Sequence, residues 1–242
     1  MAYQAVFKRK EMKYLITDGQ YNAMTAALKE RMVPDDFAYS RISNLYYDTP
    51  DFRLIRESLA KPKYKEKLRL RCYDIPDEQT EAFLEIKKKY AGIVYKRRVT
   101  LPYQEAVAYL AGESSGGTNQ IFRELTWMLR SYERLAPAMF LYYDRCSWKN
   151  KGEAPVRITF DQNIRWRTED LDLSQGTHGE PLLLPGQKLM EIKISNAMPL
   201  WLAQTLSDLR IYPTSFSKYG KAYKTMLRRN LLEKREEEER YA

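Results

Sequence analysis

Residues 65–72 (KEKLRLRC) alternate charged and apolar side chains. Successive side chains of a β-strand point to opposite faces, so we predict that the basic residues here share one face and Leu68, Leu70 and Cys72 the other. The same alternation places further basic residues on such faces. The predicted set is Lys65, Lys67, Arg69, Arg71, Lys87, Lys89, Lys96, Arg98, Arg145, Arg157 and Lys193.

The acids on these predicted faces are Glu85, Asp161 and Glu191, so basic residues outnumber them by eight. One interpretation is an open sheet with one apolar and one solvated face, as antiparallel sheets often have. That explains the polarity but not its sign, because solvated faces usually mix both charges. The other interpretation is a curled sheet whose basic lumen is wet and holds a polyanion, with arginines suited to bidentate phosphate contacts.

The carboxylates suggest a metal ligand. Glu85 and Glu191 each stand two residues before a lysine of the same predicted face. A carboxylate in a phosphate-binding wall is costly unless a divalent cation bridges it to phosphate, and Mg²⁺ and Mn²⁺ prefer such oxygen ligands. The alternative is an ion pair with the neighbouring lysine, which we weigh more heavily for Glu85 than for Glu191.

Charged pairs near both ends of the chain could extend the site. Glu11 and Lys13 share a face of the first predicted strand. Lys218 and Lys221 stand three residues apart at a predicted helix start, where the helix dipole favours anions. The alternative for the second pair is a solvated helix face.

The elements that must position these residues are mainly strands. We predict strands at 3–17, 41–47, 64–73, 82–90, 94–101, 139–148, 156–161, 164–167 and 188–195, and helices at 18–32, 52–59, 102–110, 121–135, 199–209 and 216–232. Asp18 is the expected N-cap of the first helix. Because strands and helices do not alternate strictly, the pattern favours an α+β fold, an antiparallel sheet with peripheral helices. We expect one domain over 1–232 and a solvated charged tail over 233–242.

Composition narrows the class of protein. The 242 residues carry a net charge of +9, a single histidine, His178, and two cysteines. This excludes a disulfide framework and any mechanism that needs two histidines. No signal peptide is recognisable, and the longest apolar run, 138–143, is far below the roughly 20 residues that span a bilayer. A cytoplasmic location is therefore expected, with an anionic partner.

Nine short motifs in order resemble the VTC-type polyphosphate polymerase domain of the triphosphate tunnel metalloenzyme (CYTH-like) superfamily. They are residues 7–14 (FKRKEMKY), 45–52 (LYYDTPDF), 65–73 (KEKLRLRCY), 84–87 (LEIK), 96–98 (KRR), 143–145 (YDR), 157–161 (RITFD), 191–193 (EIK) and 216–219 (FSKY). The resemblance covers nearly the whole chain, from about residue 7 to 225.

The resemblance implies an antiparallel β-barrel that forms a basic tunnel, and a divalent metal, Mn²⁺ or Mg²⁺, held by Glu191. It also implies a phosphate-binding wall of Lys13, Lys67, Arg69, Arg71, Lys87, Arg145, Arg157, Lys218 and Lys221. Strand alternation adds Lys65, Arg98 and Lys193 to that wall. Glu11 and Glu85 are candidates for orienting a metal or water.

One departure bears on subtype. Hydrolytic and cyclising members of the superfamily open with a Glu-x-Glu-x-Lys motif, whereas this chain has Arg9, Glu11 and Lys13. The replacement of the first acid by Arg9 indicates the polymer-handling branch. Transmembrane helices and the inositol-phosphate-sensing domain of eukaryotic versions do not accompany these motifs, so we expect that regulation and export of the polymer are not encoded here. A membrane partner is possible but is not encoded in these motifs.

The expected activity is transfer of the γ-phosphate of ATP to a polyphosphate chain, with release of ADP. The substrates expected are ATP and inorganic polyphosphate, pyrophosphate or triphosphate, and no specific nucleic acid. Two alternatives remain open at this point. One is a tripolyphosphatase, in which Glu11 could orient water, and the other is a non-catalytic polyanion-binding module.

Overall fold

The structure is a computed structural model that describes residues 10–150, 156–195 and 197–241. It divides into two compact units, which are described separately. The first contains the described residues up to Arg41 together with those of Tyr143–Ile164 and Leu183–Phe216. The second contains Ile42–Tyr142, Arg165–Leu182 and the described residues from Ser217 onward.

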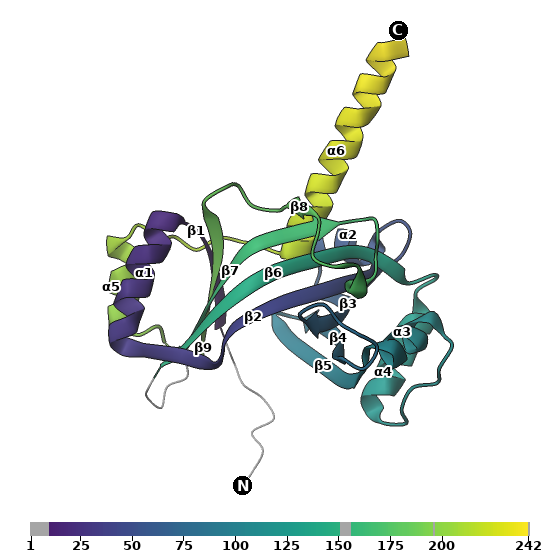
Figure 1. Cartoon of the computed structure of the whole chain (residues 1–242), viewed down its shortest axis with the longest axis horizontal. Coiled ribbons are helices and arrows are strands. Elements are labelled where there is room, and N and C mark those ends of the chain that lie inside the picture. The colour runs from purple at the N-terminus through teal and green to yellow at the C-terminus, as the bar shows by residue number, and fades with distance from the viewer. Residues whose placement is uncertain (1–9, 151–155, 196, 242) are drawn as a thin grey trace. The chain divides into compact units, whose positions relative to one another are not determined.

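The described residues form nine strands and six α-helices (Figure 1). The strands are β1 (Lys10–Thr17), β2 (Met32–Asp48), β3 (Tyr64–Tyr73), β4 (Glu81–Tyr90), β5 (Ile93–Pro102), β6 (Ala136–Asn150), β7 (Val156–Arg167), β8 (Glu180–Pro181) and β9 (Gln187–Ile194). The helices are α1 (Asp18–Arg31), α2 (Arg53–Leu59), α3 (Tyr103–Ala111), α4 (Gln120–Ser131), α5 (Leu200–Asp208) and α6 (Lys218–Tyr241).

The strands pair in the order β1-β9-β7-β6-β2-β3-β4-β5, with β8 joined to β7. Every pairing whose register is defined is antiparallel. The predicted α+β class with an antiparallel sheet is therefore confirmed. In the part of the chain that the structure describes, no hydrogen-bonded pairing joins β1 to β5, so backbone pairing does not close the sheet into a barrel.

The first unit packs α1 and α5 against one face of β1, β9 and β7. Apolar residues of these strands, such as Tyr14, Phe160 and Ile192, contact Met24 of α1 and Leu202 of α5 in one core. Because side chains alternate along each strand, burial of this face turns the charged residues of β1, β9 and β7 to the opposite face.

The second unit has a core between the sheet and helices α3 and α4, which lie beside β4 and β5 (Figure 1). Leu68 and Leu70 of β3, and Leu84 and Ile86 of β4, are fully buried there. Helix α2 packs against β3 and α6. As in the first unit, burial of the apolar face leaves the basic residues of β3, β4 and β5 on the other face.

Several boundaries differ from the sequence-based prediction. Thr17 rather than Asp18 caps α1, because its hydroxyl accepts the Gln20 N–H while the Gln20 side chain accepts the Thr17 N–H. Strand β2 begins at Met32, nine residues earlier than predicted, and β7 is one strand that continues through Asn163, where φ is +52°. Residues 3–9 of the first predicted strand lie outside the described residues.

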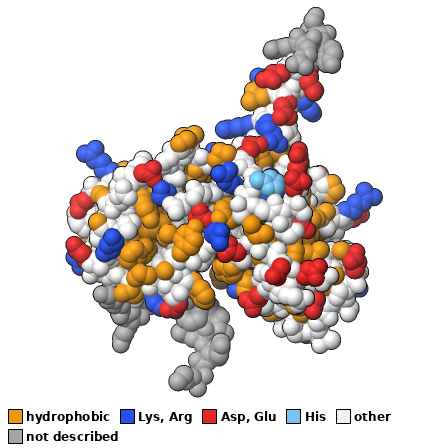
Figure 2. Space-filling model, in the orientation of Figure 1, with side chains coloured by type: hydrophobic (Ala, Val, Ile, Leu, Met, Phe, Trp, Pro, Cys, Tyr) orange, Lys and Arg blue, Asp and Glu red, His pale blue; other side chains and the backbone are white. Residues whose placement is uncertain are grey.

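Helix α6 continues to Tyr241 instead of ending near residue 232. Residues 233–238 are exposed, and Figure 2 shows basic and acidic side chains interspersed along this helix. Such mixed charge is typical of a solvated helix. Among the described residues, no helix has the length and apolar character needed to cross a membrane.

Candidate functional site

Strands β3, β4 and β5 of the second unit align the predicted basic residues in register. Lys67 pairs with Lys87, and Lys87 pairs with Lys96. The next row consists of Arg69, Glu85 and Arg98. This basic face, as we call it, contains Lys65, Lys67, Arg69, Arg71, Lys87, Lys89, Lys96, Arg98 and Glu85. It holds eight basic side chains and one acid, so the formal charges of the set sum to +7.

Glu85 is the acid at the centre of the basic face, and its side chain is 1% exposed. It forms ion pairs with Arg69 at 2.6 Å, Lys96 at 2.5 Å and Arg98 at 2.6 Å. Burial raises the pKa of Glu85, but the surrounding cations outweigh this and hold the pKa well below its ordinary value. Glu85 is therefore ion-paired, as the alternative interpretation held, but with cross-strand partners.

Lys96 is the residue of the basic face whose charge is easiest to remove. Burial is the main cause that lowers the pKa of Lys96 to about 8, and repulsion from Arg98 and Arg69 adds to it against the attraction of Glu85. The ammonium group is thus close to half-protonated just above neutral pH. A bound polyanion would restore the full charge, because it favours the protonated form.

Strand β2 contributes two polar residues that the sequence analysis did not select. Tyr46 pairs with Arg69 and Asn44 pairs with Arg71 across β2 and β3. Arg69 donates to the Tyr46 hydroxyl at 3.3 Å, and Arg71 Nε donates to Asn44 Oδ1 at 2.9 Å. Burial raises the pKa of Tyr46, but the charges of Arg69, Lys67 and Arg71 outweigh this and lower the pKa to about 8. These contacts orient both arginines.

The start of α6 is anchored to the same strands. Lys67 Nζ donates to Ser217 Oγ at 3.4 Å, and the Tyr219 ring stacks on Tyr46 with centroids 4.5 Å apart. The Tyr219 hydroxyl donates to the buried Asp48 carboxylate at 2.7 Å. Asp48 also accepts the backbone N–H groups of Leu54 and Ile55 in α2. These bonds fix the helix turn that carries the predicted residues Lys218 and Lys221.

In the first unit, Glu191 of β9 lies among three basic side chains and is 7% exposed. Its carboxylate is 3.2 Å from Lys13 Nζ, 3.5 Å from Arg145 Nη2 and 3.8 Å from Lys193 Nζ. Burial lowers the pKa of Lys193, and Arg145 and Arg157 add to this against Glu191 and Glu11. Glu191 is therefore the point where the predicted site residues of β1, β6 and β9 meet.

The other acids of this unit balance its remaining cations. Arg145 forms a two-pronged ion pair with the fully buried Asp161, at 2.6 and 2.8 Å. Burial opposes the charge of Arg145, but Asp161, Tyr143 and Glu191 raise its pKa well above the ordinary value. Arg157 is 2.8 Å from Asp35. Glu11 is 3.4 Å from Lys13 and 4.0 Å from Lys193.

We call this set the balanced face, because four basic residues contact four carboxylates in it. Its members are Lys13, Arg145, Arg157, Lys193, Glu11, Asp35, Asp161 and Glu191. The predicted excess of positive charge thus belongs to the second unit. Asp35 adds compensation that alternation did not include, because it lies in a part of β2 that was not predicted.

The carboxylate oxygens of the balanced face are ligands of the kind that a divalent cation prefers. Lys13 Nζ contacts both Glu191 and Glu11, so two carboxylates converge on one position. Among the described residues, no group of three or more His, Cys, Asp or Glu side chains is arranged to hold a metal. Mg²⁺ and similar ions are commonly bound by one or two carboxylates, with water and substrate phosphates as the other ligands. Glu191 and Glu11 therefore fit an ion that arrives with a phosphate ligand.

The predicted site residues thus fall into two groups. The first unit holds Glu11, Lys13, Arg145, Arg157, Glu191 and Lys193, and the second holds Lys65, Lys67, Arg69, Arg71, Glu85, Lys87, Arg98, Lys218 and Lys221. Arg9, which replaces an acid of the related hydrolases, lies outside the described residues. His178 belongs to the loop after β7, where its ring contacts Asp170 at 3.1 Å.

Similarity to solved structures supports the fold. A putative adenylyl cyclase from Hippeastrum, described as having a dominant triphosphatase activity, matches with a TM-score of 0.52 at 15% identity over 86% of this chain and 92% of that one. A putative adenylate cyclase from Vibrio parahaemolyticus matches with a TM-score of 0.46 at 14% identity over 91% and 99% of the two chains.

No curated protein matches the chain. The model of the VTC domain family matches residues 8–227, which include every predicted site residue. The strand order, the two charged faces and the anchored start of α6 all lie within that span. This chain therefore belongs to the VTC domain family.

Proposed function

We propose that this protein is a polyphosphate polymerase that transfers the γ-phosphoryl group of ATP to the end of a polyphosphate chain and releases ADP. A terminal phosphate oxygen of the acceptor forms a bond to the γ-phosphorus, and the bond from that phosphorus to the β,γ-bridging oxygen breaks. The observation that carries the proposal is the basic face of β3, β4 and β5, which holds eight basic side chains and one acid.

The basic face suits a linear polyanion better than a compact ligand. Its cations form successive rows that run across adjacent strands. Neighbouring strands lie about 4.8 Å apart, so the cations of a row are regularly spaced. Arg69 and Arg71 are oriented by Tyr46 and Asn44, so their guanidinium groups are positioned in advance. Phosphoryl transfer depends mainly on such positioning and on charge neutralisation. Lys218 and Lys221 would add phosphate contacts at the start of α6.

The acid at the centre of the basic face is a poor general base, which supports transfer to phosphate there. Glu85 contacts three cations, and they hold its pKa below the ordinary value. A carboxylate held ionised in this way has little tendency to accept a proton. An acceptor phosphate oxygen is already ionised near neutral pH, so it needs no base. Water as the nucleophile would need one.

We assign the metal–triphosphate part of the substrate to the balanced face. Glu191, with Glu11 beside it, would hold Mn²⁺ or Mg²⁺, and the ion would supply charge neutralisation for the donor phosphates. Lys13, Lys193, Arg145 and Arg157 would bind phosphate oxygens and orient the triphosphate. An ATP–metal complex carries less charge than a free polyphosphate, which matches the lower net charge of this face.

A tripolyphosphatase is the second candidate, because the Hippeastrum protein of similar fold has a dominant triphosphatase activity. In that case water attacks the terminal phosphate, and Glu11 is the acid available to orient it. Glu11 is more exposed than Glu191, at 34% against 7%. It therefore loses less by exchanging its lysine contacts for water.

The proposed activity is tested by incubating the purified chain with ATP and either Mn²⁺ or Mg²⁺, with and without a short polyphosphate primer. Gel electrophoresis with a polyanion stain should reveal polymer that grows with time and is degraded by an exopolyphosphatase. Nucleotide binding without turnover under every condition would reduce the protein to a polyanion-binding module.

We propose a cytoplasmic location. Both cysteines are free thiols. Burial raises the pKa of Cys72 to about 12, so this thiol stays protonated and inert. Free thiols and ATP as donor both suit a reducing, nucleotide-rich compartment.

A further inference from the structure

The hairpin of β4 and β5 ends in an unusually apolar tip. Ala91 and Gly92 form its two-residue turn with φ values of +45° and +88°, as a tight right-twisted hairpin requires. The side chains around this turn are exposed: Tyr90 56%, Ile93 54%, Val94 50% and Tyr95 44%. Four neighbouring apolar side chains in water are unfavourable, so the tip is suited to contact another phase or molecule.

Basic residues surround the tip. Lys88, Lys89, Lys96 and Arg97 flank it along the two strands. The Lys63 carbonyl accepts the Ala91 N–H at 2.9 Å, which places residues 61–63, with exposed Lys61 and Lys63, beside the turn. The acids that pair with these residues are Glu124, which contacts Lys88 and Arg97 at 3.3 Å, and Glu85, which contacts Lys96. The surroundings of the tip are therefore strongly positive.

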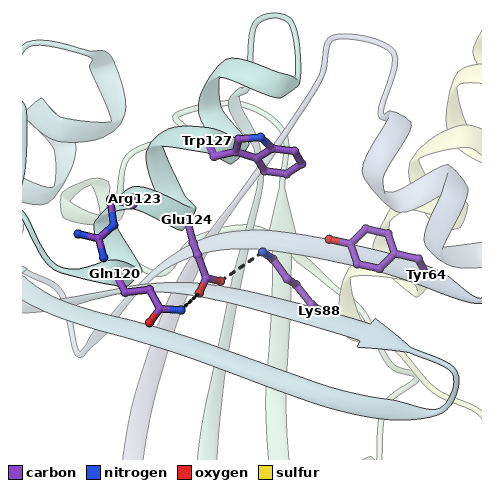
Figure 3. A pocket seen from close by; sticks show the side chains of 6 residues that line it. All are labelled: Tyr64, Lys88, Gln120, Arg123, Glu124 and Trp127. Atoms are coloured by element: carbon purple, nitrogen blue, oxygen red, sulfur yellow. Dashed lines mark hydrogen bonds and ion pairs between the residues drawn. The ribbon is translucent and has the colours of Figure 1, made fainter.

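Aromatic side chains extend the tip toward α4. Tyr64 pairs with Tyr90 across β3 and β4, and Trp127 of α4 is 59% exposed. Figure 3 shows the Tyr64 hydroxyl pointing toward Lys88, with the Trp127 ring across from it, around a shallow pocket of about 360 Å³. The Tyr64 hydroxyl donates to the buried Glu66 carboxylate at 2.6 Å, so the rings of Tyr64 and Trp127 add aromatic surface beside the tip. Tyr and Trp rings are enriched at membrane–water interfaces.

We propose that this end of the second unit docks on the surface of an anionic lipid bilayer. Tyr90, Ile93, Val94 and Tyr95 would enter the headgroup region, and Lys61, Lys63, Lys88 and Arg97 would contact anionic headgroups. A soluble phosphate chain would account for the lysines but not for the apolar tip. Peripheral binding of this kind needs no membrane-spanning helix, and it is independent of the proposed polymerase activity.

Sedimentation of the full chain with vesicles tests the proposal. The vesicles are phosphatidylcholine alone, or phosphatidylcholine with about a third phosphatidylserine. Binding to the anionic vesicles is expected, with loss at high salt. The double variant Tyr90→Ser with Ile93→Ser should bind the anionic vesicles about tenfold more weakly than the wild type does. Its affinity for tripolyphosphate should be unchanged.

A matched control removes exposed apolar residues elsewhere. Leu200 and Tyr212 of the first unit are 84% and 70% exposed, so Leu200→Ser with Tyr212→Ser should bind vesicles like the wild type. Lys61→Gln with Lys63→Gln tests the charges and should also weaken vesicle binding roughly tenfold. Circular dichroism of each variant verifies that the fold is retained.

Two results would overturn the proposal. One is failure of the wild type to bind the anionic vesicles at low salt. The other is a tip variant that binds them as well as the wild type, since attraction of the basic residues alone would then explain the binding. Neither result bears on polymer synthesis, which is measured without lipid.

Discussion

The basic face of the second unit and the balanced face of the first share one sequence pattern but differ in charge. Both alternate apolar and charged side chains along antiparallel strands, with the apolar side in a helix-covered core. On the basic face a single acid, Glu85, meets three cations. On the balanced face four carboxylates meet four basic residues.

This difference separates two kinds of phosphate binding. A face with excess positive charge gains from any polyanion, and its affinity falls steeply with salt. A face whose cations already contact carboxylates gains little from a bare anion, because those ion pairs must break. A metal–phosphate complex instead brings a cation to the carboxylates and an anion to the lysines.

The largest effect is expected at the balanced face. Glu191→Gln removes the carboxylate that contacts Lys13, Arg145 and Lys193, so metal-dependent turnover should fall by a hundredfold to a thousandfold, on the order seen for loss of one electrostatic group. Binding of metal-free tripolyphosphate should be retained. Turnover with ATP and calorimetric binding without metal measure the two quantities.

The matched control for Glu191 is Glu124→Gln. Glu124 also contacts two basic residues, Lys88 and Arg97, but belongs to neither face. Its activity should equal that of the wild type. Equal loss in both variants would mean that any ion-paired acid matters in the same way, and the metal assignment would be abandoned.

The next effect is expected at the basic face. Arg69→Ala removes a guanidinium group that contacts both Glu85 and Tyr46, and affinity for tripolyphosphate without metal should fall by about a hundredfold. Arg69→Lys keeps the charge but not the planar fork, so its affinity should be intermediate. Arg123→Ala, at an exposed position of α4, is the control. An Arg69→Ala variant with wild-type affinity would exclude this face as the polyanion site.

A smaller effect concerns the anchoring of α6. Tyr219→Phe deletes the hydroxyl that donates to buried Asp48, so the free energy of unfolding should fall by about 1–2 kcal/mol. Tyr212→Phe, at an exposed position, should leave it unchanged. Urea denaturation measures both. A Tyr219→Phe variant as stable as the wild type would show that stacking on Tyr46, and not the hydroxyl, fixes the helix.

The smallest predicted effect is a pH dependence confined to the basic face. The pKa values of Lys96 and Tyr46 are both lowered to about 8. As pH rises from 7 to 9, Lys96 loses a positive charge and Tyr46 gains a negative one, so polyphosphate binding should weaken several-fold. Lys96→Arg with Tyr46→Phe should flatten this profile. An unchanged profile in that variant would assign the titration to other groups.

Strand alternation predicted much of the candidate site, because a period of two fixes which side chains share a face. It placed Lys67, Arg69 and Arg71 together, and β3 has the predicted bounds. It did not predict the partners of those residues, since pairing depends on register between strands far apart in sequence. One interpretation of Glu85 was an ion pair with its neighbouring lysine along the strand, but its partners are on β3 and β5.

Other features depended on contacts that no local pattern reveals. Tyr46 stands in a motif quoted for the family resemblance, but its role emerges only from register with Arg69 and stacking on Tyr219. Asp35 follows Pro34, a residue that argues against a strand, and so its pairing with Arg157 was missed. Alternation therefore predicted the basic residues of the two faces better than the acidic residues that pair with them.

The central claim is that phosphate passes from ATP to phosphate and not to water. The most direct measurement is the stoichiometry of products when the chain turns over ATP with Mn²⁺ or Mg²⁺ and a short polyphosphate primer. Quantifying ADP, acid-insoluble polymer and orthophosphate together should give one polymer phosphate for each ADP, with little orthophosphate. ADP accompanied by an equal amount of orthophosphate, with no polymer, would contradict the account.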